Sequence, residues 1–95
     1  MSMKESYEKK LEAKLDELSA EIDKLKAKAK QTEADTELEY YKHIEELKTM
    51  QENARTKLNE LKVASNDAWE DLKTGLDHAK DSLNDALKSV ASRFK

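Results

Sequence analysis

The two histidines are the side chains of this sequence with the widest choice of chemistry. Glu39 lies one helical turn before His43, and Glu46 follows three residues after it, so the three could share one helix face and hold a divalent cation. The same spacing is ordinary on a solvated helix face, where charges pair with one another. The Glu-x-x-His spacing of di-iron bundles is absent. We therefore expect no metal site and no cofactor.

Groups suited to catalysis are scarcer still. The sequence has no cysteine and no glycine-rich phosphate loop, and its one glycine is Gly75. No serine or threonine forms a recognisable motif with a histidine and a carboxylate. Neighbouring carboxylates such as Glu45 and Glu46 are typical of a wet helix surface. The sequence predicts that the protein is not an enzyme.

The balance of charge argues against some partners and compartments. Among 95 residues, 18 are basic and 21 acidic, and the two signs alternate along the chain. A nucleic-acid-binding surface needs a basic patch, so we expect no nucleic-acid partner. The lack of cysteine is compatible with a reducing compartment, and no apolar run resembles a signal peptide or approaches the ~20 residues that cross a bilayer. We expect a cytoplasmic protein.

A long apolar stripe determines how the helices that carry these side chains pack. Its members follow at alternating steps of four and three residues, which keeps one seam of a helix facing a partner helix. Because 41% of the residues are charged, a single small chain has little to bury. We therefore expect a homo-oligomer, or a helical protein partner, held by this seam. The predicted oligomer seam is Leu11, Leu15, Leu18, Ile22, Leu25, Tyr40, Ile44, Leu47, Leu58 and Leu61.

Residues 26–37 contain no large apolar side chain, and two interpretations compete there. Lysines followed by acidic residues favour a helix end and a new start, which Thr32 and Asp35 could cap. The absence of glycine, proline and asparagine favours one continuous helix. We favour continuity and keep as the alternative a chain that folds back near Thr32 into an antiparallel three-helix bundle.

A clearer break is expected at residues 65–67. Asn66 tolerates the left-handed conformation that ends helices, and Asp67 with Glu70 resembles a capping pair. The helix that follows is amphipathic. Its predicted docking face is Trp69, Leu72, Leu76, Leu83, Leu87, Val90 and Phe94. The predicted fold is therefore all-α, with a long coiled-coil helix over residues 1–66 and an amphipathic C-terminal helix over residues 67–95.

The last helix could dock on a protein or on a membrane surface. Aromatic residues near its two ends, Trp69 and Phe94, suit an interfacial helix. Residues 67–95 carry five basic and six acidic groups, so anionic lipid would give no electrostatic help. We favour a structural or interaction protein and keep peripheral lipid binding as the alternative function.

Several segments resemble a widespread family of short bacterial coiled-coil proteins associated with stress response. They include Leu11-Glu-Ala-Lys-Leu-Asp-Glu-Leu, Ala20-Glu-Ile-Asp-Lys-Leu-Lys-Ala-Lys-Ala and Glu39-Tyr-Tyr-Lys-His-Ile-Glu-Glu-Leu. The most distinctive are Ala68-Trp-Glu-Asp-Leu-Lys and the ending Ser92-Arg-Phe-Lys. The resemblance covers nearly the whole length, with Asn66 where relatives often have glycine and Lys80 where they often have a second tryptophan. It implies a non-enzymatic, helical, stress-linked protein.

Overall fold

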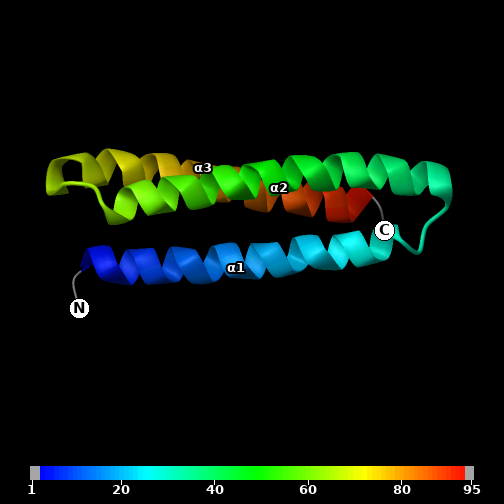
Figure 1. Ribbon diagram of the computed structural model, residues 1–95, viewed down its shortest axis with the longest axis horizontal. Helices are drawn as coiled ribbons and strands as arrows, with labels where there is room; N and C mark the ends of the chain where they lie inside the picture. The colour runs from blue at the N-terminus through cyan, green and yellow to red at the C-terminus, as the bar shows by residue number, and fades with distance from the viewer. Residues whose placement is uncertain (1–2, 94–95) are drawn as a thin grey trace.

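The computed structural model describes residues 3–93, which form three helices joined by two short connections (Figure 1). Helix α1 spans Met3–Ala29, α2 spans Ala34–Lys62 and α3 spans Asn66–Arg93. The middle helix runs antiparallel to the other two, so α1 and α3 are parallel (Figure 1). The bundle measures 50 × 20 × 18 Å. The all-α class is confirmed, in the form of the antiparallel three-helix bundle that was the alternative.

The predicted continuous helix is interrupted after Ala29, so that expectation is wrong for residues 30–33. The Thr32 backbone N–H donates to the Ala29 carbonyl oxygen at 3.2 Å, and the Thr32 hydroxyl donates to the same oxygen at 2.7 Å. Thr32 therefore closes α1 instead of capping α2. At the start of α2, Glu33 makes no side-chain cap.

Burial explains why the chain turns at this point. A continuous helix keeps its backbone hydrogen bonds, but its apolar stripe stays in water unless another chain covers it. Residues 26–37 have no large apolar side chain, so a turn there sacrifices little packing. Lys26 and Lys28 end α1, while Asp35 and Glu37 begin α2, as helix dipoles favour. Tertiary burial thus outweighs local helix propensity.

The second break falls within two residues of the predicted one, with a different cap. The Ser65 Oγ accepts a hydrogen bond from the Ala68 backbone N–H at 3.4 Å, so Ser65 caps α3. Asp67 lies in the first turn of α3 instead. No non-glycine residue between residues 3 and 93 has a positive φ, so Asn66 does not adopt the left-handed conformation.

Apolar stripes from all three helices meet in one core. Tyr40 is the largest of its fully buried side chains. Gln51 is the buried polar residue of the described chain, and its Nε2 donates to the Leu15 carbonyl oxygen at 3.2 Å. Because a shifted α1/α2 alignment would leave this buried amide without its acceptor, Gln51 fixes the register of the two helices.

Candidate functional site

All ten residues of the predicted oligomer seam are buried inside the single chain. The docking face predicted on α3 joins the same core: Leu76, Leu83, Leu87 and Val90 are buried, and Trp69 and Leu72 are half-buried against them. Phe94 lies outside the described residues. The stripes that the sequence assigned to a partner therefore cover one another. Homo-oligomer formation itself stays untested, but the closed core removes the reason for which the sequence predicted it.

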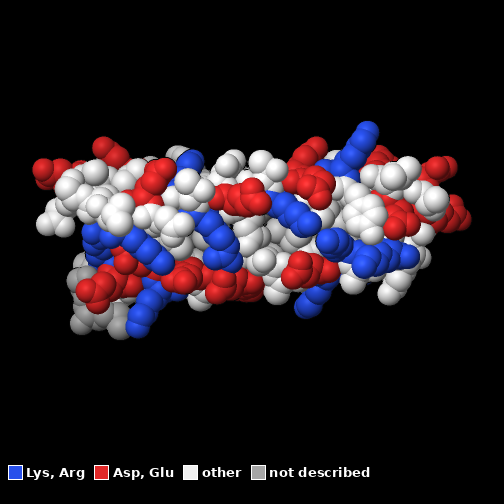
Figure 2. All heavy atoms as spheres, in the orientation of Figure 1, with Lys and Arg blue, Asp and Glu red and all other residues white. Residues whose placement is uncertain are grey.

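The seam between α1 and α2 is bridged by ion pairs of opposite charge and contains one hollow of about 210 Å³ beside Ile22. Arg55 of α2 contacts Asp16 of α1 at 2.6 Å, and Lys62 contacts Glu12 at 3.3 Å. On the face shown in Figure 2, basic and acidic side chains lie close to one another along the line between these helices. The charges on the two sides of this seam therefore neutralise each other within the molecule.

Glu39, His43 and Glu46, which the sequence suggested as possible cation ligands, lie at the seam between α2 and α3. The Arg93 guanidinium of α3 lies 3.9 Å from Glu39 and 3.4 Å from Nε2 of His43. His43 Nδ1 lies 3.7 Å from Glu46. The positively charged Arg93 side chain thus lies next to Glu39 and His43, where a bound metal ion would have to lie. In residues 3–93 no three His, Cys, Asp or Glu side chains come together as a metal-binding group.

The seam between α1 and α3 is hollowed along much of its length. Two adjoining hollows of about 550 and 260 Å³ share Tyr7 and Lys10, and a third of about 280 Å³ lies between Lys24 and Leu87. We call these hollows together the α1/α3 groove. Its α1 bank includes Tyr7, Lys10, Leu11, Lys14, Lys24 and Lys28. Its α3 bank includes Trp69, Lys73, Asp77, Lys80, Leu87 and Ala91.

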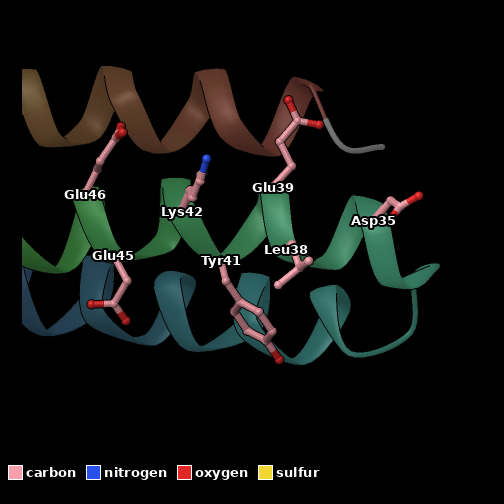
Figure 3. A pocket seen from close by; sticks show the side chains of 7 residues that line it. All are labelled: Asp35, Leu38, Glu39, Tyr41, Lys42, Glu45 and Glu46. Carbon is pink, nitrogen blue, oxygen red and sulfur yellow. The ribbon is translucent and has the colours of Figure 1, made fainter.

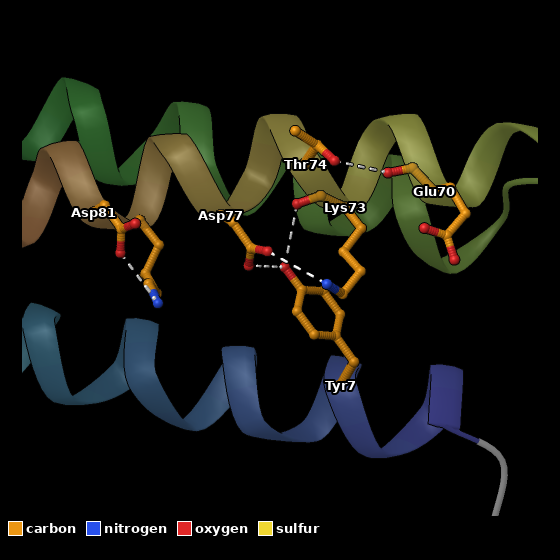
Figure 4. Close-up of polar contacts among 7 residues, drawn as sticks. Tyr7, Glu70, Lys73, Thr74, Asp77 and Asp81 are labelled. Atoms are coloured by element: carbon orange, nitrogen blue, oxygen red, sulfur yellow. Dashed lines mark hydrogen bonds and ion pairs between the residues drawn. The ribbon is translucent and has the colours of Figure 1, made fainter.

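Tyr7 crosses the groove near one end of the bundle (Figure 4). Its hydroxyl donates to Asp77 Oδ1 at 2.5 Å, and Lys73 Nζ lies 3.5 Å from the other carboxylate oxygen. The same ammonium group lies 5.1 Å from the centre of the Tyr7 ring. Trp69 packs against that ring edge-to-face, with 5.6 Å between ring centres. Tyr7 therefore links α1 to α3 where the seam is otherwise open.

The environment of Tyr7 suits a structural donor better than a reactive phenolate. Burial, followed by the hydrogen bond to Asp77 and the negative charge of that carboxylate, raises the pKa of the phenol above its usual value. The hydroxyl therefore stays protonated at neutral pH. Our sequence analysis did not include Tyr7, although its position one turn before Leu11 is a signal that extends the stripe.

The outward surface of α2 presents a separate apolar spot in a hollow of about 860 Å³, which is larger than any one hollow of the groove but is lined by α2 alone (Figure 3). Leu38 is 68% exposed, beside the half-buried Tyr41. Acidic side chains surround them, including Asp35, Glu39 and Glu45. Burial, and then the hydrogen bond to nearby Glu37, raise the pKa of Tyr41. The apolar part covers about one helical turn, which is much shorter than the α1/α3 groove.

Comparisons with known proteins place no constraint on these sites. No protein-family model, curated protein or solved structure matches the chain. None of the helices in residues 3–93 has an apolar stretch sufficient to span a bilayer. The α1/α3 groove is therefore the best candidate site on geometric grounds, as the longest hollowed seam between helices.

Proposed function

We propose that this chain is a non-enzymatic interaction protein, which folds as one three-helix bundle and binds a protein partner in the α1/α3 groove. The observation that supports this proposal is the difference between the seams. The α1/α2 seam is bridged by Arg55–Asp16 and Lys62–Glu12 and contains one hollow of about 210 Å³. The α1/α3 seam has no such ion pair within residues 3–93 and contains three hollows with apolar side chains at their base. Such a lined groove is a common binding surface for a helix.

The distribution of apolar side chains favours a protein partner over a lipid surface. The apolar face of α3 contributes to the core, so it is not free to enter a bilayer. The large apolar residues left exposed in the described chain are Met3, Leu38 and Val63. Leu38 lies near the start of α2, at the opposite end of the bundle from the other two (Figure 1). They form no continuous surface.

The biological setting is proposed from the resemblance. A role in the bacterial stress response follows from the family that the segments around Trp69 and Ser92 resemble, and a cytoplasmic location is proposed from the lack of cysteine. A small, cysteine-free bundle without evident catalytic groups is suited to holding another protein. In this proposal the chain acts by binding a protein in the α1/α3 groove, and its biological role depends on which protein that is.

Site-specific photo-crosslinking tests the proposed use of the groove. A photoreactive amino acid at Lys14 places the reactive group in the groove, and the same group at Lys57 places it on an exposed part of α2. In bacterial cells that produce the chain, we expect discrete protein adducts from position 14 and few from position 57. Equal adduct patterns from the two positions would contradict a groove-specific partner.

Lipid binding has its own test, because Trp69 is the single tryptophan and lines the groove. Vesicles of phosphatidylcholine and phosphatidylglycerol are added to the purified protein while Trp69 emission is recorded. We expect the spectrum to stay unchanged and the protein to remain in the supernatant after sedimentation. A strong blue shift with co-sedimentation would favour the lipid-binding alternative.

A further inference from the structure

The two banks of the α1/α3 groove carry charges of the same sign. Lys10 and Lys14 of α1 share hollows with Lys73 and Lys80 of α3. Further along, Lys24 and Lys28 line the third hollow, and the acidic residues of the whole lining are Glu21, Glu70 and Asp77. The lining thus has six lysines and three acids, although the chain as a whole has a net charge of −3. Two of these lysines pair with acids just outside the lining, Lys14 with Glu17 and Lys80 with Asp81.

The positive charge is only partly compensated inside the molecule. Lys73 pairs with Asp77 of its own helix, and that carboxylate is also the acceptor for Tyr7. Lys10, Lys24 and Lys28 form no ion pair within residues 3–93. These three lysines all belong to the α1 bank, and no ion pair within residues 3–93 joins the two banks, in contrast to the cross-helix pairs of the α1/α2 seam. A negatively charged occupant would compensate them.

The base of the groove is apolar and the groove is long. Leu11 lines the middle hollow, and Leu25, Leu87 and Ala91 line the third. Tyr7 and Lys28, at its two ends, are 21 residues apart on α1, which corresponds to roughly 32 Å of helix. These dimensions suit a helix of about 20 residues lying along the two parallel helices.

We infer that the α1/α3 groove binds an acidic amphipathic α-helix of another protein. The apolar stripe of that helix would lie on the groove base, and its flanking carboxylates would pair with lysines of both banks. This inference rests on the proposed function and names the chemistry of the partner. A second copy of the chain fits less well, because the apolar part of its exposed surface around Leu38 is about one turn long.

Synthetic helical peptides of about 20 residues provide the probe. The first has leucines along one face and glutamates beside them, the second replaces the glutamates with lysines, and the third keeps the glutamates without the leucines. Binding to the full-length protein is measured by peptide fluorescence anisotropy and by Trp69 emission. We expect the first peptide to bind most tightly and its affinity to fall with salt.

Charge reversal then tests whether binding occurs in the groove. The double variant Lys10→Glu/Lys24→Glu changes two exposed groove lysines, and Lys42→Glu/Lys57→Glu makes the same change on exposed positions of α2. We expect the groove variant to weaken binding of the first peptide by about tenfold or more, and the α2 variant by less than about twofold. Circular dichroism checks that both variants fold.

Other outcomes would overturn the inference in different ways. Tighter binding of the lysine peptide, with sensitivity to the groove variant, rejects the acidic partner but leaves the groove as an interaction site. If the peptide without leucines bound as tightly as the first peptide, binding would be general charge attraction and the apolar base of the groove would have no role. Groove-dependent binding of phosphatidylglycerol vesicles without peptide binding would indicate lipid, and concentration-dependent self-association would indicate a second copy. If no peptide binds and the Lys14 crosslinker gives no specific adduct, the proposed function fails as well.

Discussion

The two seams that α1 forms with its neighbours are built from opposite arrangements of charge. Towards α2, acidic residues such as Asp16 face basic residues such as Arg55, at 2.6 Å. Towards α3, lysines line both banks, and Tyr7 reaches across to Asp77. One helix thus has an acidic flank that is neutralised within the molecule and a basic flank that is compensated only in part.

This difference separates the parts of α1 that hold the fold from the part available for binding. The buried stripe, from Leu11 to Leu25, contacts the core on both sides and is required whatever the protein binds. The α2 flank adds cross-helix pairs and the Gln51 contact to the Leu15 carbonyl. The α3 flank adds hollows and uncompensated charge, which contribute little to folding and suit recognition of a partner.

The largest expected effect comes from the stripe that both seams share. Leu15 is fully buried, so Leu15→Asp places an unpaired carboxylate in the core. The cost is about 4 kcal/mol or more, comparable with the whole stability of a small domain. We expect loss of cooperative thermal unfolding by circular dichroism. The control is Leu38→Asp, at an exposed leucine, which should change stability by less than about 0.5 kcal/mol. Similar effects at both positions would contradict the placement of the core.

The next effect concerns the side chain that bridges the open seam. Tyr7→Phe removes the hydroxyl that donates to Asp77 and keeps the ring against Trp69. Loss of a half-buried hydrogen bond to a charged acceptor should lower the unfolding free energy by about 1–2 kcal/mol in urea denaturation. Tyr41→Phe, on the outer surface of α2, should have a smaller effect. If the two variants were equally stable, Tyr7 would not be a structural link.

The same hydrogen bond has a pH signature. Burial and Asp77 raise the pKa of Tyr7, so the folded state holds the phenol proton more tightly than the unfolded state. The resulting stability is fully present below the unfolded pKa of about 10 and is lost as the pH rises beyond it. We expect the difference in unfolding free energy between the wild type and Tyr7→Phe to shrink from about pH 9 to about pH 11. If this difference in unfolding free energy grew between about pH 9 and about pH 11, it would contradict a raised pKa of Tyr7 in the folded state.

The smallest effects compare charge reversal on the two flanks of α1. Asp16→Lys places a lysine opposite Arg55 and should destabilise the fold by up to about 1 kcal/mol at low salt. Lys10→Glu, on the groove flank, should be neutral or slightly stabilising because it reduces repulsion between the banks. Both differences should decrease in high salt. Equal destabilisation by the two changes would remove the distinction between the seams.

The sequence predicted the core residues better than it predicted their partner. Spacing identified the buried stripe of α1 and the apolar face of α3, because a helix that buries one face must repeat apolar residues at that period. The same spacing is satisfied by another chain or by another helix of the same chain. Residues 26–37 were ambiguous for two opposing reasons. Their side chains favour a helix, but they include no large apolar residue whose burial would require the helix to continue.

The groove was harder to predict than the core. Lys10 and Lys24 are 14 residues apart and so share one side of α1, but the sequence does not show that this side faces lysines of α3. Tyr7 bonds to Asp77 across 70 residues of sequence. Only the tertiary arrangement brings these groups together, because neither motif spacing nor local propensity relates positions so far apart.

Small-angle X-ray scattering over a range of concentrations tests the central claim that the apolar stripes of the three helices bury one another within one chain. The bundle predicts a mass near 10.9 kDa at low concentration and a longest dimension close to 50 Å. A particle of higher mass with a longest dimension of roughly 90 Å, as a continuous helix from about residue 4 to 64 would give, would contradict the account.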